Sequence, residues 1–213
     1  MAGRVLSAGH DLIVWNRTAD KTRPLVDQGA RAARTPAEAA GEAEIVITML
    51  ADPAALEAVV LGQDGVAGAI APTACLVEMS TVGPKAELAV KDRLPAGTGF
   101  VDAPVMGSVG PARSGELTVL AGGDVDRVEK VLAIFGTVVR CGPAGSGAAR
   151  KIVLISAAVA GVTLVGELLA LAAALGVPRD AAFQGLAADR WRAASAALRA
   201  PAATTSSRWP PRT

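Results

Sequence analysis

The sequence has little of three things from which functional sites are often built: histidine, cysteine and unbalanced charge. It contains one histidine and two cysteines, and its formal net charge is +1. Cys75 and Cys141 stand far apart in no metal or redox spacing, so we expect small buried side chains in a reducing compartment. His10 follows Gly9 in a turn without a partner motif, and we expect it at the surface with no role. No serine or cysteine has a visible catalytic pairing, and no metal site is expected.

The balanced charge also argues against two classes of partner. A net charge of +1 offers no electrostatic attraction for nucleic acid or for an anionic membrane surface. The stretch Met1 to Leu6 is too short for a secretory signal and carries Arg4, so we expect a cytoplasmic protein. With 213 residues, 51% of them hydrophobic, the chain has enough material for one large domain or one and a half.

One long apolar run, Ile152 to Leu175, contains a single charged residue, Glu167. Its length suits a membrane span. A carboxylate inside a bilayer is costly, however, and no aromatic belt flanks the run. We therefore expect a helix that is buried on most of its circumference in a soluble, oligomeric domain. A glycine-rich turn at residues 142–147 opens it, and Gly176 ends it as a C-terminal cap.

Before Gly142, short apolar segments alternate with helical patterns, which predicts an α/β fold with a mostly parallel sheet. We place the Rossmann-like domain at 1–141, the start of an all-helical domain at 142–187, and a poorly ordered tail at 188–213, where no apolar period is visible. The expected strands are 11–15, 30–33, 44–49, 74–79, 99–102, 117–121 and 138–141. The expected helices are 1–9, 19–28 with Leu25 and Val26 inward, 36 onward with Thr35 as its N-cap, 53–61, 84–93, 124–135 and 178–187.

Ligands of such sheets bind beyond the carboxyl ends of the strands, and small or polar residues gather there in this sequence. Asn16, Arg17 and Thr18 follow one strand, and an arginine between an amide and a hydroxyl suits a 2′-phosphate, although an ordinary solvated loop fits the same residues. The segment Asp102 to Gly107 is either a carboxylate-binding turn, through backbone amides near Gly107, or a plain structural turn with Asp102 as a cap.

Lys151 lies at the mouth of the long apolar helix, next to Arg150. A buried lysine has a lowered pKa and can act as a general acid or base. A lysine at a helix end can instead extend its charge into solvent. These residues alone slightly favour the surface lysine, and both interpretations stay open.

Eight short segments occur along the chain in one characteristic order. They are Ala8 to His10, Val14 to Thr18, Val46 to Leu50, Glu78 to Thr81, Asp102 to Val105, Ala112 to Gly115, Gly122 to Asp124 and Gly145 to Lys151. In this set and order the chain resembles the β-hydroxyacid dehydrogenase family, the group of 3-hydroxyisobutyrate dehydrogenase and its relatives, over residues 1 to about 187. The imine reductases share much of the same pattern.

The resemblance implies a site for NADP, with NAD possible, and hydride transfer between the cofactor and a small β-hydroxyacid. It implies that Lys151 is the catalytic acid/base and that the helical domain pairs with a second copy in a homodimer. By the same resemblance, the cofactor-binding residues are Asn16, Arg17, Thr18, Met49, Leu50 and Thr81. The implied substrate-binding residues are Val105, Met106, Gly107 and Ser108.

The chain departs from the family pattern in three places. The opening strand and its Gly-x-Gly-x-x-Gly turn are missing, since Met1 matches a position in the first helix. The order Met106, Gly107, Ser108 replaces a serine followed by two glycines, and Leu154 with Ile155 replaces a pair of asparagines. The helical domain is also short. These departures support two alternatives to the dehydrogenase: an imine reductase-like enzyme, and a non-catalytic remnant or dimerisation module.

Overall fold

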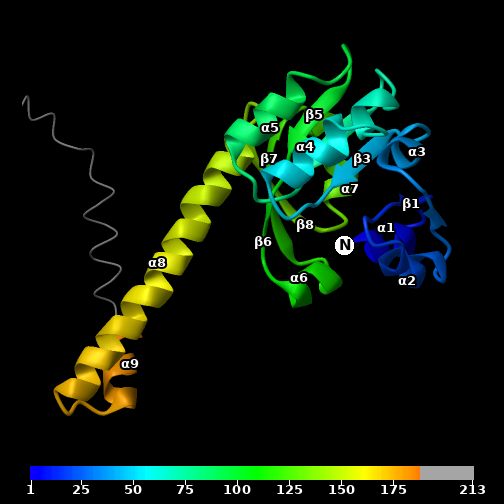
Figure 1. The fold of residues 1–213 in the computed structure, drawn as a ribbon. Helices are drawn as coiled ribbons and strands as arrows, with labels where there is room; N and C mark the ends of the chain where they lie inside the picture. Colours follow the sequence, from blue (N-terminus) through cyan, green and yellow to red (C-terminus); the bar gives the residue numbers. More distant parts are fainter. Residues whose placement is uncertain (188–213) are drawn as a thin grey trace, which may run out of the picture. The chain divides into compact units, whose positions relative to one another are not determined.

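A computed structural model describes residues 1–187, so the tail expected at 188–213 lies outside the described residues. The chain divides into two compact units (Figure 1). The first is Met1–Ser156, and the second begins at Ala157. The long helix α8 (Ser146–Ala174) starts in the first unit, although the sequence predicts a domain boundary already at residue 142.

The helices and strands lie close to the segments expected from the sequence, although many are shorter. The strands are β1 (Ile13–Val14), β2 (Arg31–Ala32), β3 (Ile45–Thr48), β4 (Cys75–Glu78), β5 (Gly99–Asp102), β6 (Val105–Met106), β7 (Leu117–Gly123) and β8 (Gly136–Gly142). The helices are α1 (Ala2–Ser7), α2 (Arg23–Val26), α3 (Pro36–Ala40), α4 (Pro53–Leu61), α5 (Pro84–Lys91), α6 (Val109–Ser114), α7 (Glu129–Leu132), α8 and α9 (Arg179–Ala187). Short 3-10 helices cover 19–22, 66–68 and 125–127.

Local sequence chemistry explains where several of these helices begin. Asp52 caps α4 by accepting a hydrogen bond from the Ala55 amide at 2.8 Å, and Pro53 follows at the first helical position. Thr35 caps α3 in the same way by accepting from the Glu38 amide at 3.0 Å, as the sequence predicts. The helix expected at 19–28 is instead a 3-10 turn followed by α2, because Pro24 has no amide hydrogen with which to continue a helix from residue 19.

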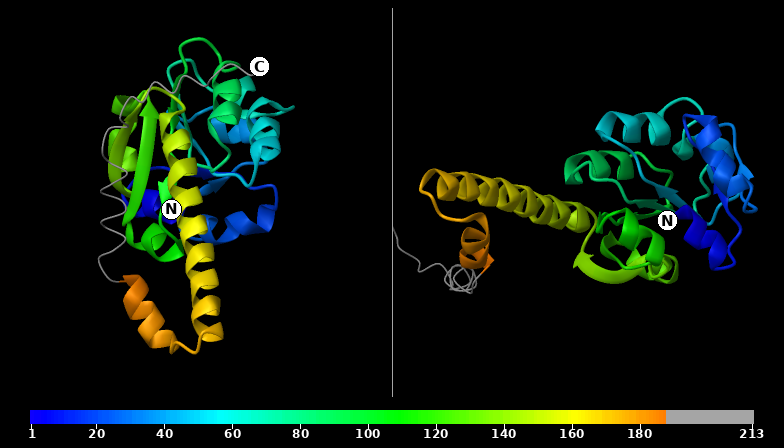
Figure 2. Two further views of the ribbon diagram at one scale, coloured as in Figure 1. Left: turned by 90° about the vertical axis from the view of Figure 1, so that its left-hand side faces the viewer. Right: turned by 90° about the horizontal axis from the view of Figure 1, so that it is seen from below.

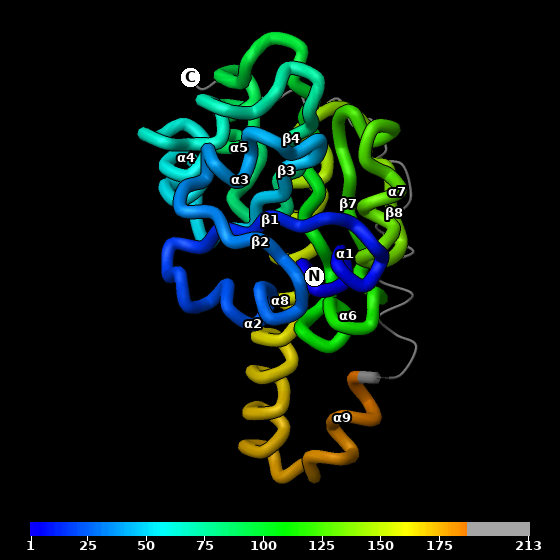
Figure 3. The backbone as a smooth tube through the Cα atoms, turned by 90° about the vertical axis from the view of Figure 1, so that its right-hand side faces the viewer, coloured from blue at the N-terminus to red at the C-terminus, as the bar shows by residue number. Residues whose placement is uncertain are grey.

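The strands form two sheets rather than one. β1 pairs with β2 in a two-stranded parallel sheet (Figure 3). The other six strands form a second sheet in which β3, β4 and β5 are mutually parallel. β7 runs antiparallel to β5 and β6, and parallel to β8. The prediction of a mostly parallel Rossmann-like sheet is confirmed, while the missing first strand stays an expectation.

β5 and β6 are two parts of one extended segment. Both pair antiparallel with β7 in a common register, Val101 with Gly123 and Val105 with Val119. The ladder is interrupted at Pro104, which cannot donate an amide hydrogen but accepts one from Leu120 at 2.9 Å. The sequence does not predict β6, because a proline interrupts the apolar pattern before it.

Each face of the larger sheet carries its own hydrophobic core, as alternation along the strands requires. On one face, Leu76 and Phe100 pack against α3, α4 and α5. On the other, Cys75, Val77 and Val101 pack with α1 and α7. The alternation continues to the strand ends, so Glu78 and Asp102 belong to the face that α5 covers. This placement puts two acids under a helix.

Most apolar side chains of α8 are exposed in the single chain, and the burial predicted for this helix in an oligomeric domain stays a prediction. Val153 is 68% exposed and Val162 is 76% exposed. Only Gly147, Ala148 and Lys151 are buried in the helix, which Figure 2 shows as continuous. By length and hydropathy, α8 is the one helix of residues 1–187 that could cross a membrane, a weak criterion that core helices of soluble proteins also meet.

Candidate active site

Lys151 lies in the second turn of α8 and is turned into the protein. Its side chain is 9% exposed, and Nζ donates to the Val105 carbonyl oxygen at 2.7 Å. The Met106 sulfur is a second acceptor at 3.5 Å. Arg150, one residue earlier, is exposed. The alternative interpretation, a lysine whose charge extends into solvent at a helix end, is therefore wrong for Lys151. Its neighbour Arg150 does extend into solvent.

This environment changes the acid–base behaviour of Lys151. Burial lowers the pKa of its ammonium group below the ordinary lysine value, because the charged form loses hydration. The two acceptors that contact Nζ are neutral, and no salt bridge within residues 1–187 involves Lys151. A lysine in this setting releases its proton more readily than a surface lysine does.

Asp102 ends β5 and caps the start of α8. Its Oδ1 accepts from the Gly145 amide at 2.7 Å, and its Oδ2 accepts from the Ala148 amide at 2.8 Å. The side chain is fully buried, which raises its pKa, while the hydrogen bonds from the backbone amides of Ala148, Gly145 and Gly147 act in the opposite direction. The cap interpretation of Asp102 is confirmed.

A second buried acid, Glu78, joins the carboxyl ends of β3 and β4. One of its oxygens accepts from the Ser80 amide at 2.7 Å, and the other accepts from the Thr48 hydroxyl. Ser80 in turn accepts from the Leu50 amide at 2.7 Å. The loops after the two strands are thus tied together by side chains, and burial raises the pKa of Glu78. Ser80, which the sequence does not single out, makes the link, and its neighbour Thr81 is exposed.

The predicted cofactor residues lie on loops after three parallel strands. Met49 is 51% exposed after β3. After β1, Asn16 holds a tight turn by accepting from the Thr18 amide at 2.9 Å. Arg17 is exposed in that turn and forms no salt bridge with any residue in 1–187. An exposed guanidinium on an ordered turn suits a phosphate group.

The predicted substrate segment divides into two parts. Val105 and Met106 are half-buried and contact Lys151, whereas Gly107 and Ser108 are exposed. Gly107 has φ +133°, and a Cβ there would lie 2.6 Å from a methyl carbon of Leu117. The close approach of this turn to β7 requires glycine. The structure therefore brings Lys151 together with Val105 and Met106, and shows no contact from Lys151 to Gly107 or Ser108.

Glu87, on α5, is a third buried acid that sequence reasoning misses. It is fully buried, and both carboxyl oxygens lack hydrogen-bond partners among the described residues. Burial and the nearby charges of Asp102 and Glu78 raise its pKa to about 9. Its signal in the sequence is the spacing of three residues from the buried Val90, which places both on one helix face. Within residues 1–187, no cluster of three or more histidine, cysteine or acidic side chains could hold a metal.

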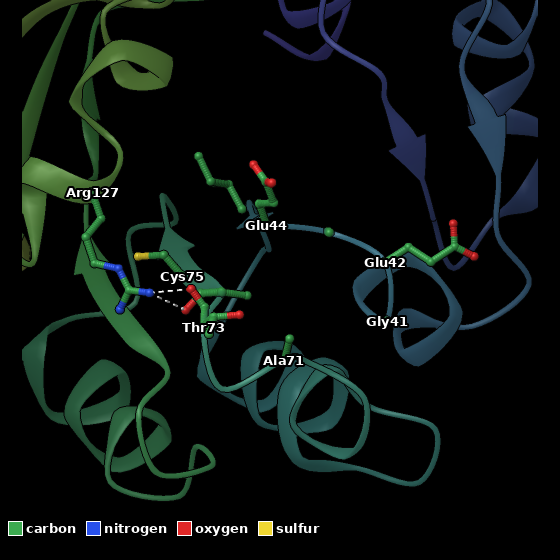
Figure 4. A pocket seen from close by; sticks show the side chains of 10 residues that line it. Gly41, Glu42, Glu44, Ala71, Thr73, Cys75 and Arg127 are labelled. Atoms are coloured by element: carbon green, nitrogen blue, oxygen red, sulfur yellow. Dashed lines mark hydrogen bonds between the residues drawn. The ribbon is translucent and has the colours of Figure 1, made fainter.

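A cavity of about 400 Å³ lies at the opposite, amino ends of β3 and β4 (Figure 4). Its lining includes Glu44, Cys75 and Arg127, and none of the predicted site residues. Arg127 donates to the carbonyl oxygens of Thr73 and Ala74. Burial raises the pKa of the Cys75 thiol to about 11, so this cysteine is a weak nucleophile. The cavity is separate from the lysine site, and Cys75 is buried as expected while Cys141 is half-buried.

Comparisons with known proteins agree with this geometry. Residues 1–145 match the family model described as the NAD binding domain of 6-phosphogluconate dehydrogenase. The chain is 33% identical over 189 residues to the 3-sulfolactaldehyde reductase of Escherichia coli, covering 86% of this chain and 63% of that protein. The chain thus spans less than two thirds of the length of this relative.

Solved structures show the same relationship. A Mycobacterium tuberculosis 3-hydroxyisobutyrate dehydrogenase with L-serine superposes with a TM-score of 0.79 and 25% identity, over 87% of this chain and 64% of that one. A reductive aminase from Aspergillus terreus in complex with NADPH4, cyclohexanone and allyl amine superposes with a TM-score of 0.73 and 28% identity, over 92% and 69%.

The family model covers residues 1–145, which include both sheets. Helix α8, which carries Lys151, begins directly after the matched region. The likeness to the 3-sulfolactaldehyde reductase rests on sequence over most of the chain. The likeness to the 3-hydroxyisobutyrate dehydrogenase rests on the superposed fold. From this agreement of sheet, motifs and relatives, the chain belongs to the NAD(P)-binding β-hydroxyacid dehydrogenase-like oxidoreductase family, with a nucleotide-binding domain of the 6-phosphogluconate dehydrogenase type.

Proposed function

We propose that the protein is an NADP-dependent oxidoreductase that interconverts a hydroxyl and a carbonyl group on a small β-hydroxyacid. The observation that carries this proposal is Lys151: its ammonium group is buried, its pKa is lowered, and Nζ is held by the Val105 carbonyl at 2.7 Å. The nicotinamide cofactor, when bound, supplies or accepts the hydride. Lys151 gives a proton to the substrate oxygen during reduction and takes it back during oxidation.

The other residues divide the remaining tasks. Arg17 and Thr18 would hold the 2′-phosphate of the cofactor, and Met49, Leu50 and Thr81 would line the site of its nicotinamide half. The segment 105–108 orients the substrate next to Nζ. The Ser80–Leu50 hydrogen bond at 2.7 Å supports this assignment because it orders two of the loops concerned. The first experiment measures cofactor binding by the isolated chain: NADPH is added stepwise to the protein, and the quenching of tryptophan fluorescence is followed.

Arg17→Ala should weaken NADPH binding by about tenfold to a hundredfold while leaving NADH binding nearly unchanged. A hydrogen bond between charged groups contributes about 1.5–3 kcal/mol, and only NADPH carries the 2′-phosphate. Trp15, which precedes this turn and donates to the Arg34 carbonyl at 3.2 Å, is a suitable fluorescent reporter. Arg113→Ala, at an exposed arginine on α6, is the control. Equal losses for the two cofactors would contradict a phosphate contact at Arg17.

An imine reductase-like activity is the second candidate. The helix positions after Lys151 are aliphatic, since Leu154 is 38% exposed and Ile155 is half-buried. An apolar wall suits a ketone and an amine better than a carboxylate. Two assays separate the candidates: NADP⁺ with 3-hydroxyisobutyrate, and NADPH with cyclohexanone and allylamine. If NADPH neither binds nor raises the melting temperature, the chain is a non-catalytic module and both enzyme proposals fail.

The exposed apolar face of α8 supports a homodimer within this proposal. Val162→Glu should convert the protein to a monomer, because a carboxylate would enter an otherwise apolar interface at a position that is 76% exposed in the single chain. Multi-angle light scattering measures the mass. Val109→Glu, on α6 with 66% exposure, is the matched control and should remain dimeric. A monomeric wild-type protein would contradict the pairing.

A further inference from the structure

One short segment, residues 102–106, makes hydrogen bonds to α8 at two successive positions along the start of the helix. At its beginning, the Asp102 carboxylate accepts the Gly145 and Ala148 amides at 2.7 and 2.8 Å. Three residues later, the Val105 carbonyl accepts from Lys151 Nζ at 2.7 Å. Ala148 and Lys151 are three positions apart, so they lie on the same helix face, one above the other.

The carboxylate of Asp102 is enclosed tightly. A Cβ added at Gly122 would lie 2.6 Å from Asp102 Oδ1, and one added at Gly147 would lie 2.8 Å from Oδ2 and 2.1 Å from the Leu120 carbonyl oxygen. Strand β7 and helix α8 therefore approach the aspartate as closely as glycine permits on both sides. The side chain is fully buried. A carboxylate in such an enclosure has little freedom to move, and neither does the helix turn bonded to it.

We propose that Asp102 is a positioning residue for Lys151: its two amide contacts set the rotation and height of the first turn of α8, so that Nζ reaches the Val105 carbonyl instead of solvent. The proposal rests on the proposed function only for the significance of Lys151 as an acid/base. Asp102 itself shows no hydrogen bond to Lys151, so its action passes through the helix backbone.

The physical reason lies in the position of Lys151 along the helix. It is the sixth residue of α8, just beyond the turn whose amides have no partner within the helix. If Asp102 stops accepting those amides, the first turn can fray, and the ammonium group regains water. The free energy of hydration then favours release of Nζ from its buried position.

The test is the substitution Asp102→Asn, and the measured quantity is the titration midpoint of the Lys151 side chain. Asparagine keeps the shape of aspartate but offers one acceptor oxygen and presents an NH₂ group to the second amide. In protein labelled with ¹³C-lysine, the ¹³Cε resonance of Lys151, assigned with Lys151→Arg, is followed against pH. We expect its titration midpoint to rise by about one pH unit toward the ordinary lysine value. The measurement needs no substrate or cofactor, so its outcome is independent of whether the oxidoreductase proposal holds.

Asp52→Ala is the control. Asp52 caps α4 through the Ala55 amide at 2.8 Å, so its replacement by alanine removes a cap from a helix that does not carry Lys151. We expect loss of stability with no change in the Lys151 midpoint. If Asp102→Asn lowers stability but leaves the Lys151 midpoint as in the wild type, Asp102 is a structural cap only and the proposal is overturned.

A measurement on the wild-type chain decides the matter if Asp102→Asn does not fold. The Asp102 carboxyl ¹³Cγ and Lys151 ¹³Cε resonances are followed together during an acid titration. The proposal expects a change at Lys151 with the midpoint of Asp102, because protonation removes one acceptor from the cap. Protonation of Asp102 without any response at Lys151 would overturn it.

Discussion

Glu87→Gln should stabilise the folded protein at pH 7 by roughly 1–3 kcal/mol, and the gain should depend on pH. Glu87 is fully buried with both oxygens unpaired among the described residues, and its pKa is raised to about 9. The folded chain must therefore keep this carboxyl group protonated, whereas the unfolded chain releases the proton at ordinary acidic pH. Glutamine has nearly the same shape and requires no proton, but its buried amide group also lacks partners among the described residues, which offsets part of the gain.

The sign and the pH window follow from the two protonation states. Below pH 4.5, the carboxyl group is protonated in both states, so the stability difference between variant and wild type should be independent of pH and least favourable to the variant. From there to about pH 9, the unfolded state binds fewer protons than the folded state, so wild-type stability falls as pH rises. The advantage of Glu87→Gln should grow through this window and level off above it.

Urea unfolding at several pH values measures the effect. Glu57→Gln is the control, since Glu57 is an exposed acid on α4, paired with Arg93 at 3.1 Å. Its substitution should change stability by less than about 1 kcal/mol at any pH. If Glu87→Gln gives a stability difference that is constant with pH, Glu87 is ionised in the folded state and the argument from burial is wrong.

Lys151→Met should lower turnover by about three orders of magnitude while leaving NADPH affinity nearly unchanged. Methionine fills a similar volume in this buried position but cannot transfer a proton. The cofactor contacts proposed above do not include Lys151. The assay is reduction of NADP⁺ with 3-hydroxyisobutyrate, with binding measured separately by tryptophan fluorescence.

Lys130→Met, at an exposed lysine on α7, controls for loss of a positive charge and should keep full activity. A Lys151→Met protein with more than a tenth of wild-type turnover would exclude Lys151 as the acid/base. A parallel loss of NADPH affinity would instead show that Lys151 supports the cofactor site, and the proton would then need another donor.

The sequence predicts most of the strands and helices because their signals are local. β5 and α4 have the predicted bounds, and Thr35 caps α3 as expected. Local signals fail where long-range contacts decide. Pairing with β7 extends Val105 and Met106 into β6 across a proline, which no local period indicates. Val26 was expected inward, but it is 39% exposed on a helix of one turn.

The candidate site shows the same division between what local sequence signals predict and what long-range contacts decide. Lys151 can be found from the sequence, because a lysine at the start of a long apolar run stands out. Whether it is buried cannot be found there, since the alternative of a solvent-exposed helix end uses the same residues. The decision comes from the Val105 carbonyl, 46 positions earlier in the chain, at 2.7 Å from Nζ. Strand pairing likewise places Glu78 beside Asp102 under α5, and the buried face of α5 itself carries Glu87.

The sequence by itself determined the class of fold, the order of most of its elements, the family and the lysine on which the proposed chemistry depends. Periodicity, caps and ordered motifs are properties of neighbouring residues, so they can be read along the chain. Only the tertiary structure decided that Lys151 is buried, that Asp102 holds its helix, that Glu87 has no partner among the described residues, and that α8 exposes its apolar side chains in the single chain. Burial and hydrogen bonding depend on residues far apart in sequence, which folding alone brings together.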